Sequence, residues 1–200
     1  MNRPAAQHRG VLALGWAIVV LTVLSALPSL AGAYTTSQSA SYQPDAWIKL
    51  CGAGDTCKHA PPHPYRGEDV FDTTGDYQTA SAGMEEGNNI RFWILLENDG
   101  TLGDTFTVHG CSGNGVFVVE AVSIGALKAP MPAPHITRAF KQGTATFTFP
   151  PSSESHDVIL TLNILAKTTV QGSRYTCPIV ITSSGDPALK DKVLAKMVTT

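Results

Sequence analysis

Alternation of apolar and polar residues restricts most of this chain to extended strands. Every second residue of segment 90–97 is apolar, and segment 143–149 alternates apolar side chains with three threonines. This period of two places the apolar side chains on one face of a strand and leaves the other face for water. Beyond residue 44, no segment sustains the three- and four-residue spacing of an amphipathic helix. The sequence therefore predicts an all-β chain.

The expected strands are separated by clusters of Gly, Pro, Asn and Asp, which are turn-forming residues. They occupy residues 46–50, 77–81, 90–97, 105–110, 116–123, 136–140, 143–149, 157–166, 173–182 and 192–197. The three strands between residues 90 and 123 follow one another closely, which predicts a meander. Pro178 cannot donate a ladder hydrogen bond, so an edge or a bulge is expected there. The whole pattern predicts a β-sandwich of about 7–9 antiparallel strands.

The first residues have the pattern of a secretory signal peptide. Basic residues precede an apolar run at 11–27, and small residues follow at 31–33, where a signal peptidase must admit them. Cleavage is therefore expected before Tyr34. An uncleaved membrane anchor is the alternative, but a spanning helix needs roughly 20 apolar residues. We expect a secreted protein without a membrane span after cleavage, with association to the cell envelope left open.

The remaining chain is expected to form one domain. Residues 1–33 are the signal peptide, residues 34–43 form a flexible lead-in rich in Ser, Thr and Gln, and residues 44–200 form the β-sandwich. The sequence has 14 Lys and Arg residues and 16 Asp and Glu residues. The basic residues form no cluster, which argues against a nucleic-acid partner. Threonine and serine on exposed strand faces account for the low charged fraction of 15%.

Four cysteines lie in the part of the chain that is expected to be exported: Cys51, Cys57, Cys111 and Cys177. An even number of cysteines in an oxidising compartment predicts disulfides, and three pairings are formally open. The turn-prone loop between Cys51 and Cys57 favours a bridge between these two residues, which leaves Cys111 to pair with Cys177.

A second interpretation of the same region is a transition-metal site. Cys57, His59 and His63 lie within seven residues and have side chains that bind zinc or copper. Prolines at 61, 62 and 64 hold this stretch extended, however, and no second pair of ligands is evident. An exposed loop stiffened by proline explains the same residues.

Calcium is a further possibility, because hard oxygen ligands suit this ion. Asp99 and Asp104 lie on one connection, and Asp69, Asp72 and Asp76 could approach it in space. The first candidates are Asp72, Asp76, Asp99 and Asp104. Their spacing does not match an EF-hand loop, and Asn and Asp are also the residues that turns between strands use. Otherwise no cofactor is expected.

Four blocks of the sequence form a recognisable set, at residues 44–49, 74–79, 92–106 and 183–193, and the third contains Asn98-Asp99-Gly100 followed by Asp104. These blocks resemble immunoglobulin-like modules of bacterial secreted and surface proteins, in particular the CARDB-like class related to cell adhesion. In that class, a stretch of the type found at residues 98–104 joins two neighbouring strands. The resemblance implies an immunoglobulin-like β-sandwich that serves in binding, adhesion or a structural role at the cell surface. This chain departs from the usual pattern because it holds one module and four cysteines.

A catalytic role is the alternative function. Ser112 follows His59, His63, Asp69 and Asp72 in the chain order of a serine-protease triad, but such a protease needs far more chain between these residues. A Gly-x-Ser-x-Gly elbow is also absent. We therefore expect no catalytic residues. A secreted hydrolase or a metal-binding protein that uses His59, His63 or the loops rich in Asp is the alternative.

A non-catalytic binding protein needs a recognition surface, and aromatic residues are the candidates. A cell-surface protein or a glycan is the expected partner, because aromatic side chains anchor interfaces. The absence of an Asn-x-Ser/Thr triplet favours a bacterial secretory route. The sequence leaves the ligand and the oligomeric state open. The candidate contact residues are Tyr42, Trp47, Tyr65, Tyr77 and His135.

Overall fold

The computed structural model describes residues 41–52, 65–126, 135–152, 158–167 and 170–200. The predicted signal peptide and most of the predicted lead-in lie outside these residues. So do three of the candidate metal ligands or disulfide partners, namely Cys57, His59 and His63.

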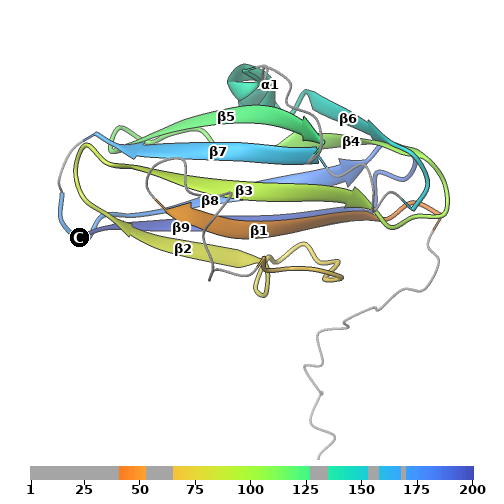
Figure 1. Ribbon diagram of the computed structural model, residues 1–200, viewed down its shortest axis with the longest axis horizontal. Helices are drawn as coiled ribbons and strands as arrows, with labels where there is room; N and C mark the ends of the chain where they lie inside the picture. The colour runs from red at the N-terminus through yellow and green to blue at the C-terminus, as the bar shows by residue number, and fades with distance from the viewer. Residues whose placement is uncertain (1–40, 53–64, 127–134, 153–157, 168–169) are drawn as a thin grey trace, which may run out of the picture. The chain divides into compact units, whose positions relative to one another are not determined.

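Two β-sheets form the described part of the chain, as the alternation predicts (Figure 1). Sheet A has the strand order β1 (Pro44–Gly52), β3 (Asn89–Asn98), β7 (Val158–Ala166) and β5 (Phe117–Ala126). Sheet B has the order β2 (Thr79–Met84), β9 (Lys190–Thr199), β8 (Arg174–Ser183), β4 (Asp104–His109) and β6 (Ala145–Phe149). The all-β sandwich is therefore confirmed.

The strand order is that of an immunoglobulin-like sandwich. Taken in chain order, β1, β3, β4, β5, β7, β8 and β9 occupy the positions of strands A to G, with A, B, E and D in one sheet and C, F and G in the other. Strands β2 and β6 are additions at the two edges of sheet B. The predicted antiparallel pairing holds for every described pair except β2 with β9, which is parallel.

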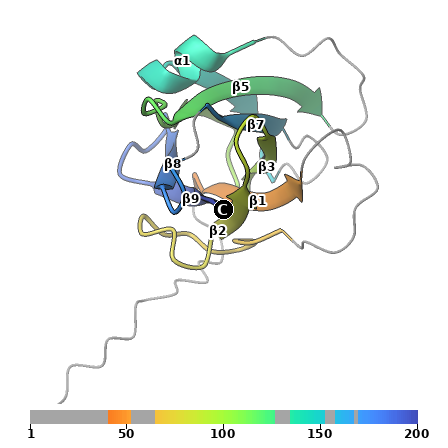
Figure 2. The same cartoon turned by 90° about the vertical axis from the view of Figure 1, so that its left-hand side faces the viewer.

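The predicted meander is wrong. Strands β3 and β5 both belong to sheet A, whereas β4, which lies between them in the chain, belongs to sheet B. Figure 2 shows the two sheets from one end of the strands. Apolar alternation identifies a strand and its buried face, but both sheets of a sandwich present the same pattern to the core. The alternation therefore carries no information on which sheet a strand joins.

The strand predicted at residues 136–140 is instead the short helix α1 (Thr137–Gln142). It ends at Gly143, whose left-handed φ of 68° is a common helix terminus. Phe140 is fully buried, and a Cβ at Gly110 would overlap its ring. The overlap requires a glycine where the helix approaches the end of β4. The Gly110 N–H also donates to the Phe140 carbonyl at 3.0 Å, which holds the two segments together.

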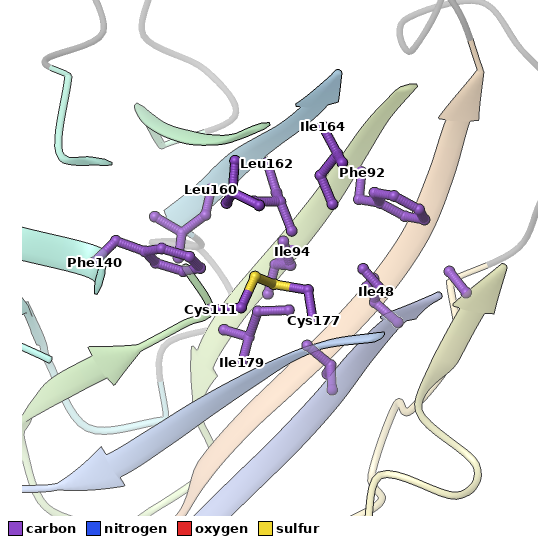
Figure 3. Close-up of a cluster of buried hydrophobic side chains, with 14 of the residues drawn as sticks. Ile48, Phe92, Ile94, Cys111, Phe140, Leu160, Leu162, Ile164, Cys177 and Ile179 are labelled. Atoms are coloured by element: carbon purple, nitrogen blue, oxygen red, sulfur yellow. A yellow bond between two sulfur atoms is a disulfide. The ribbon is translucent and has the colours of Figure 1, made fainter. Parts of the chain in front are cut away.

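The core lies between the sheets and surrounds a disulfide (Figure 3). Cys111, just after β4, is bonded to Cys177 of β8 with a Cα–Cα distance of 5.1 Å, which confirms the predicted pair. Cys51 is also disulfide-bonded, but its predicted partner, Cys57, lies outside the described residues. The side chains around the bridge come from both sheets and include Ile48, Phe92, Ile94, Leu160, Leu162, Ile164 and Ile179.

The position of Pro178 agrees with the local edge predicted for it. Strand β8 lies between β9 and β4, but its pairing with β4 ends at Val180, opposite His109. Pro178 lies two residues beyond that point and remains in register with Leu194 of β9. A missing N–H donor is therefore tolerated there.

Candidate functional site

One cluster of aromatic and basic side chains lies on the outer surface of sheet A. Trp47 and Lys49 alternate along β1 with the core residues Ala46 and Ile48, so they point away from the core. Trp93 of β3 is paired in register with Lys49. The fourth member is Tyr65, next to Arg66, whose backbone exchanges hydrogen bonds of 2.8 and 2.9 Å with Ile48.

These four residues, the aromatic–lysine face, contact one another closely. The rings of Trp47 and Tyr65 meet edge to face with centroids 5.9 Å apart. The Lys49 ammonium lies 5.0 Å from the Tyr65 ring centroid and 5.3 Å from that of Trp93. All four side chains are half-buried. Aromatic residues held in place with a polar group are the type that anchors protein interfaces.

The structure brings together two of the five predicted contact residues, Trp47 and Tyr65. Tyr77 is 62% exposed, and His135 is exposed as well. Tyr42 is half-buried, with its ring against Gly185. The sequence prediction missed Trp93 and Lys49, although Trp93 occupies the outward phase of the strand predicted at residues 90–97.

Shallow grooves run along β2. One, of about 390 Å³, is lined by Arg66, Asp76 and Tyr77 together with Leu50, Thr79, Ala80 and Ser81. Another, of about 570 Å³, lies over β2, β8 and β9 and includes Arg174 and Lys196. The described lining residues of these two grooves include no histidine.

A buried carboxylate, Asp191 of β9, joins β1, β9 and the segment before β2. It is fully buried and accepts hydrogen bonds from the backbone N–H groups of Ala46 and Lys192 at 2.8 Å and of Asp72 at 3.3 Å. The Gln78 Nε2 donates to both of its oxygens at 2.8 Å and to the Val70 carbonyl at 2.7 Å. Asp191 therefore fixes several elements that are distant in the sequence.

A second buried carboxylate, Asp45, lies on β1 next to this network. It is fully buried, and its Oδ2 accepts from the Trp47 Nε1–H and, at 3.2 Å, from the Asp69 N–H. Its Oδ1 has no hydrogen-bond partner. Carboxylate oxygens of Asp45, Asp69 and Asp99 all lie within 4.8 Å of one another. Asp45 thus connects the aromatic–lysine face, through Trp47, to an acidic cluster.

Burial shifts the ionisation of both aspartates. Loss of solvation raises the pKa of Asp45 from 3.8 to about 8, and the nearby charge of Asp191 adds to the rise. Loss of solvation likewise raises the pKa of Asp191 from 3.8 to about 7, although its hydrogen bonds, led by that of Gln78, act in the opposite direction. Both side chains therefore tend to hold a proton in the folded protein at mildly acidic pH.

This shift makes a prediction for the pH dependence of stability. Between pH 3.8 and about 7, folded Asp191 holds a proton that the unfolded chain has lost, so raising the pH favours unfolding. The stabilisation that protonated Asp191 contributes is complete below this interval and is lost across it, by roughly 4 kcal/mol in total. Denaturant unfolding in a chelator-containing buffer should show wild type losing stability relative to Asp191→Asn as pH rises; parallel pH profiles for the two proteins would contradict the shift.

The four aspartates predicted as calcium ligands do not form one site. Asp72 accepts from the Thr74 and Gly75 N–H groups at 2.6 and 2.7 Å, which is turn chemistry. Asp104 is buried and accepts from the Thr105 and Gly185 N–H groups and from the Ser183 hydroxyl. Asp76 is exposed and lines the smaller groove. Only Asp99 belongs to the acidic cluster, and the prediction missed Asp45.

The other predicted chemistry stays untested. His59, His63 and Cys57 lie outside the described residues, so the predicted transition-metal site and the histidines of the triad are not described. Ser112 is exposed, and its carbonyl accepts a hydrogen bond from the Tyr175 hydroxyl.

Sequence comparison places the chain in no family. No family model matches the sequence, and no curated protein matches it. The predicted resemblance to the CARDB-like class therefore stays a prediction.

Several solved structures show distant similarity to this chain. A family 123 glycoside hydrolase from Clostridium perfringens is 10% identical with a TM-score of 0.44, over 78% of this chain and 27% of the hydrolase. The seventh PapD-like domain of human CEP192 is 12% identical with a TM-score of 0.34, over 61% and 80% of the two chains. The N-terminal domain of PorA is 10% identical with a TM-score of 0.36, over 78% and 97%. Similarity at this level carries no information on function.

Among the residues that the structure describes, we find no helix with both the length and the hydrophobicity of a membrane span.

Proposed function

We propose that this chain is a secreted, non-catalytic binding module that contacts another protein of the bacterial cell surface through the aromatic–lysine face. The observation that carries the proposal is the cluster on the outer surface of sheet A, in which Lys49 contacts the rings of Tyr65 and Trp93 and Trp47 packs against Tyr65. Trp and Tyr are enriched among the residues that dominate protein interfaces. The resemblance to adhesion-related modules points in the same direction.

A protein partner is favoured over a glycan by the arrangement of the rings. Stacking on a sugar needs a flat and accessible ring face. The Lys49 ammonium covers one face of Tyr65 and one face of Trp93, and the Trp47 and Tyr65 ring planes meet at 72°. The cluster thus places a positive charge beside two rings that each have one face occupied, and this charge complements an acidic or carbonyl-rich protein surface.

Export is supported by the disulfide chemistry. The Cys111–Cys177 bridge is buried in the core, and Cys51 is bonded as well. Disulfides persist in secreted and periplasmic proteins and are rare in reducing compartments. A β-sandwich with a disulfide in its core suits a protein that acts outside the cell.

The proposal is tested by comparing captures from the envelope of the producing organism. Wild-type protein should capture an envelope protein that Trp93→Ala and Lys49→Glu lose, because the first removes an anchor and the second reverses the charge. Tyr77→Ala, which removes an exposed tyrosine elsewhere, should capture it as wild type does. Unfolding curves of all four proteins establish that the variants are folded.

Two results would contradict the proposal. Equal capture by wild type and by Trp93→Ala would show that the aromatic–lysine face is not the interface. Binding to a glycan array, or turnover of a hydrolase substrate, that disappears in the same variants would show that the face serves a sugar or a reaction instead.

A further inference from the structure

Three aspartates that are distant in the sequence meet beside the start of β1. Pairing of Asp45 with Glu97 brings the turn after β3, and therefore Asp99, close to Asp45. The Asp99 N–H donates to the Gln43 carbonyl at 3.0 Å, which holds this turn against the residues before β1. Asp69 reaches the same place because its N–H donates to the Asp45 carboxylate.

One carboxylate oxygen of this cluster lacks a hydrogen-bond donor. Asp45 is fully buried, and its Oδ2 is engaged by the Trp47 Nε1–H and the Asp69 N–H. Its Oδ1 is buried and accepts no hydrogen bond. A buried acceptor without a partner is costly, and nearly all such atoms in folded proteins are satisfied. In the ionised form of Asp45, which is the form that binds a cation, the ionised carboxylates of Asp69 and Asp99 cannot satisfy this oxygen, because they carry no donor.

We propose that Asp45, Asp69 and Asp99 bind a single divalent cation of the calcium type. Calcium takes six to eight oxygen ligands at about 2.3–2.6 Å, so oxygens on one coordination shell lie up to about 5 Å apart. The carboxylate oxygens of the three aspartates lie within 4.8 Å of one another, which lets all three reach one ion. The ion supplies the partner that the Asp45 Oδ1 lacks.

The burial of the three residues gives the site one closed and one open side. Asp45 is buried and forms the base, Asp99 is half-buried, and Asp69 is exposed to solvent. The ion therefore enters from the solvent side, where water completes its coordination. Once bound, it links β1, the turn after β3 and the segment that contains Asp69, and so stabilises this part of the sandwich.

Calcium titration of chelator-treated protein tests the proposal. Calorimetry should show one calcium ion per chain, with a Kd in the range of about 10⁻⁴–10⁻³ M that is usual for extracellular modules. At a calcium concentration 100 times the Kd, the thermal midpoint should rise by roughly 5–10 °C. Magnesium should bind more weakly, because it demands a smaller octahedral shell.

Matched variants assign the binding to these residues. Asp69→Asn and Asp99→Asn each remove a charge without changing the size of the side chain, and each should weaken calcium binding about tenfold or more. Asp76→Asn, at an exposed aspartate outside the cluster, should bind calcium as wild type does. The proposal is overturned by an absence of calcium binding at about 10 mM, by equal affinity for magnesium, or by unchanged binding in both cluster variants.

Discussion

Replacing both Cys111 and Cys177 by alanine is expected to lower the free energy of unfolding by about 4 kcal/mol. The bridge closes a loop with a sequence separation of 66, so its loss releases much chain entropy in the unfolded state. Both side chains also contribute to the core, where Cys177 is fully buried and Cys111 is 9% exposed. Denaturant unfolding of the variant and of wild type measures the difference.

The variant Cys51→Ala, Cys57→Ala is the comparison. These residues are six positions apart, so if they pair as predicted, their short loop contributes only about 2 kcal/mol. Losing the long bridge should therefore destabilise the protein more than losing the short one. A loss under about 1 kcal/mol for the Cys111 and Cys177 variant would contradict the role given to the long bridge.

Asp191→Ala is expected to destabilise the protein by about 3–5 kcal/mol. The substitution leaves the backbone N–H groups of Ala46 and Lys192 and the Gln78 amide without the acceptor that they share. Burial prevents water from replacing the carboxylate freely, so each donor bears a desolvation cost. Urea or guanidinium unfolding measures the loss.

Asp186→Ala is the control for this prediction. Its carboxylate accepts one exposed turn hydrogen bond, from the Ala188 N–H at 3.0 Å, so its removal should cost about 1 kcal/mol or less. The stability of Asp191→Asn should lie between those of the two alanine variants. Its side chain keeps one oxygen acceptor, but its amide NH₂ group faces the donor of Gln78 or Ala46. Equal stability of the Asp191→Ala and Asp186→Ala variants would contradict a central role for Asp191.

Much of the fold could be predicted because burial in a sandwich leaves a period of two in the sequence. The segments that became β3, β6, β7, β8 and β9 all show it. Helix α1 could not be distinguished from a strand by its sequence, because it covers less than two turns and buries only Phe140. The parallel pairing of β2 with β9 is set by the path of the chain around the edge of sheet B, which periodicity does not record.

The candidate sites were harder to predict because their members are far apart in the sequence. Asp72 and Asp99 lie between strands, and Asp104 is the first residue of β4. Nothing local shows that Asp72 and Asp104 bond to nearby backbone whereas Asp99 joins a cluster. Asp45 lies in a strand, and from the sequence alone an acidic residue in a strand is expected to face solvent. Trp93 and Lys49 become neighbours only through the register of β1 with β3.

Photo-crosslinking in the envelope of the producing organism tests most directly whether the aromatic–lysine face is a protein interface. A photo-reactive phenylalanine derivative replaces Tyr65 in one protein and the exposed Tyr77 in another, and both are irradiated in place. The proposed function predicts a covalent adduct with one envelope protein from position 65 and none from position 77. An adduct from position 77 alone, or from neither position, would contradict it.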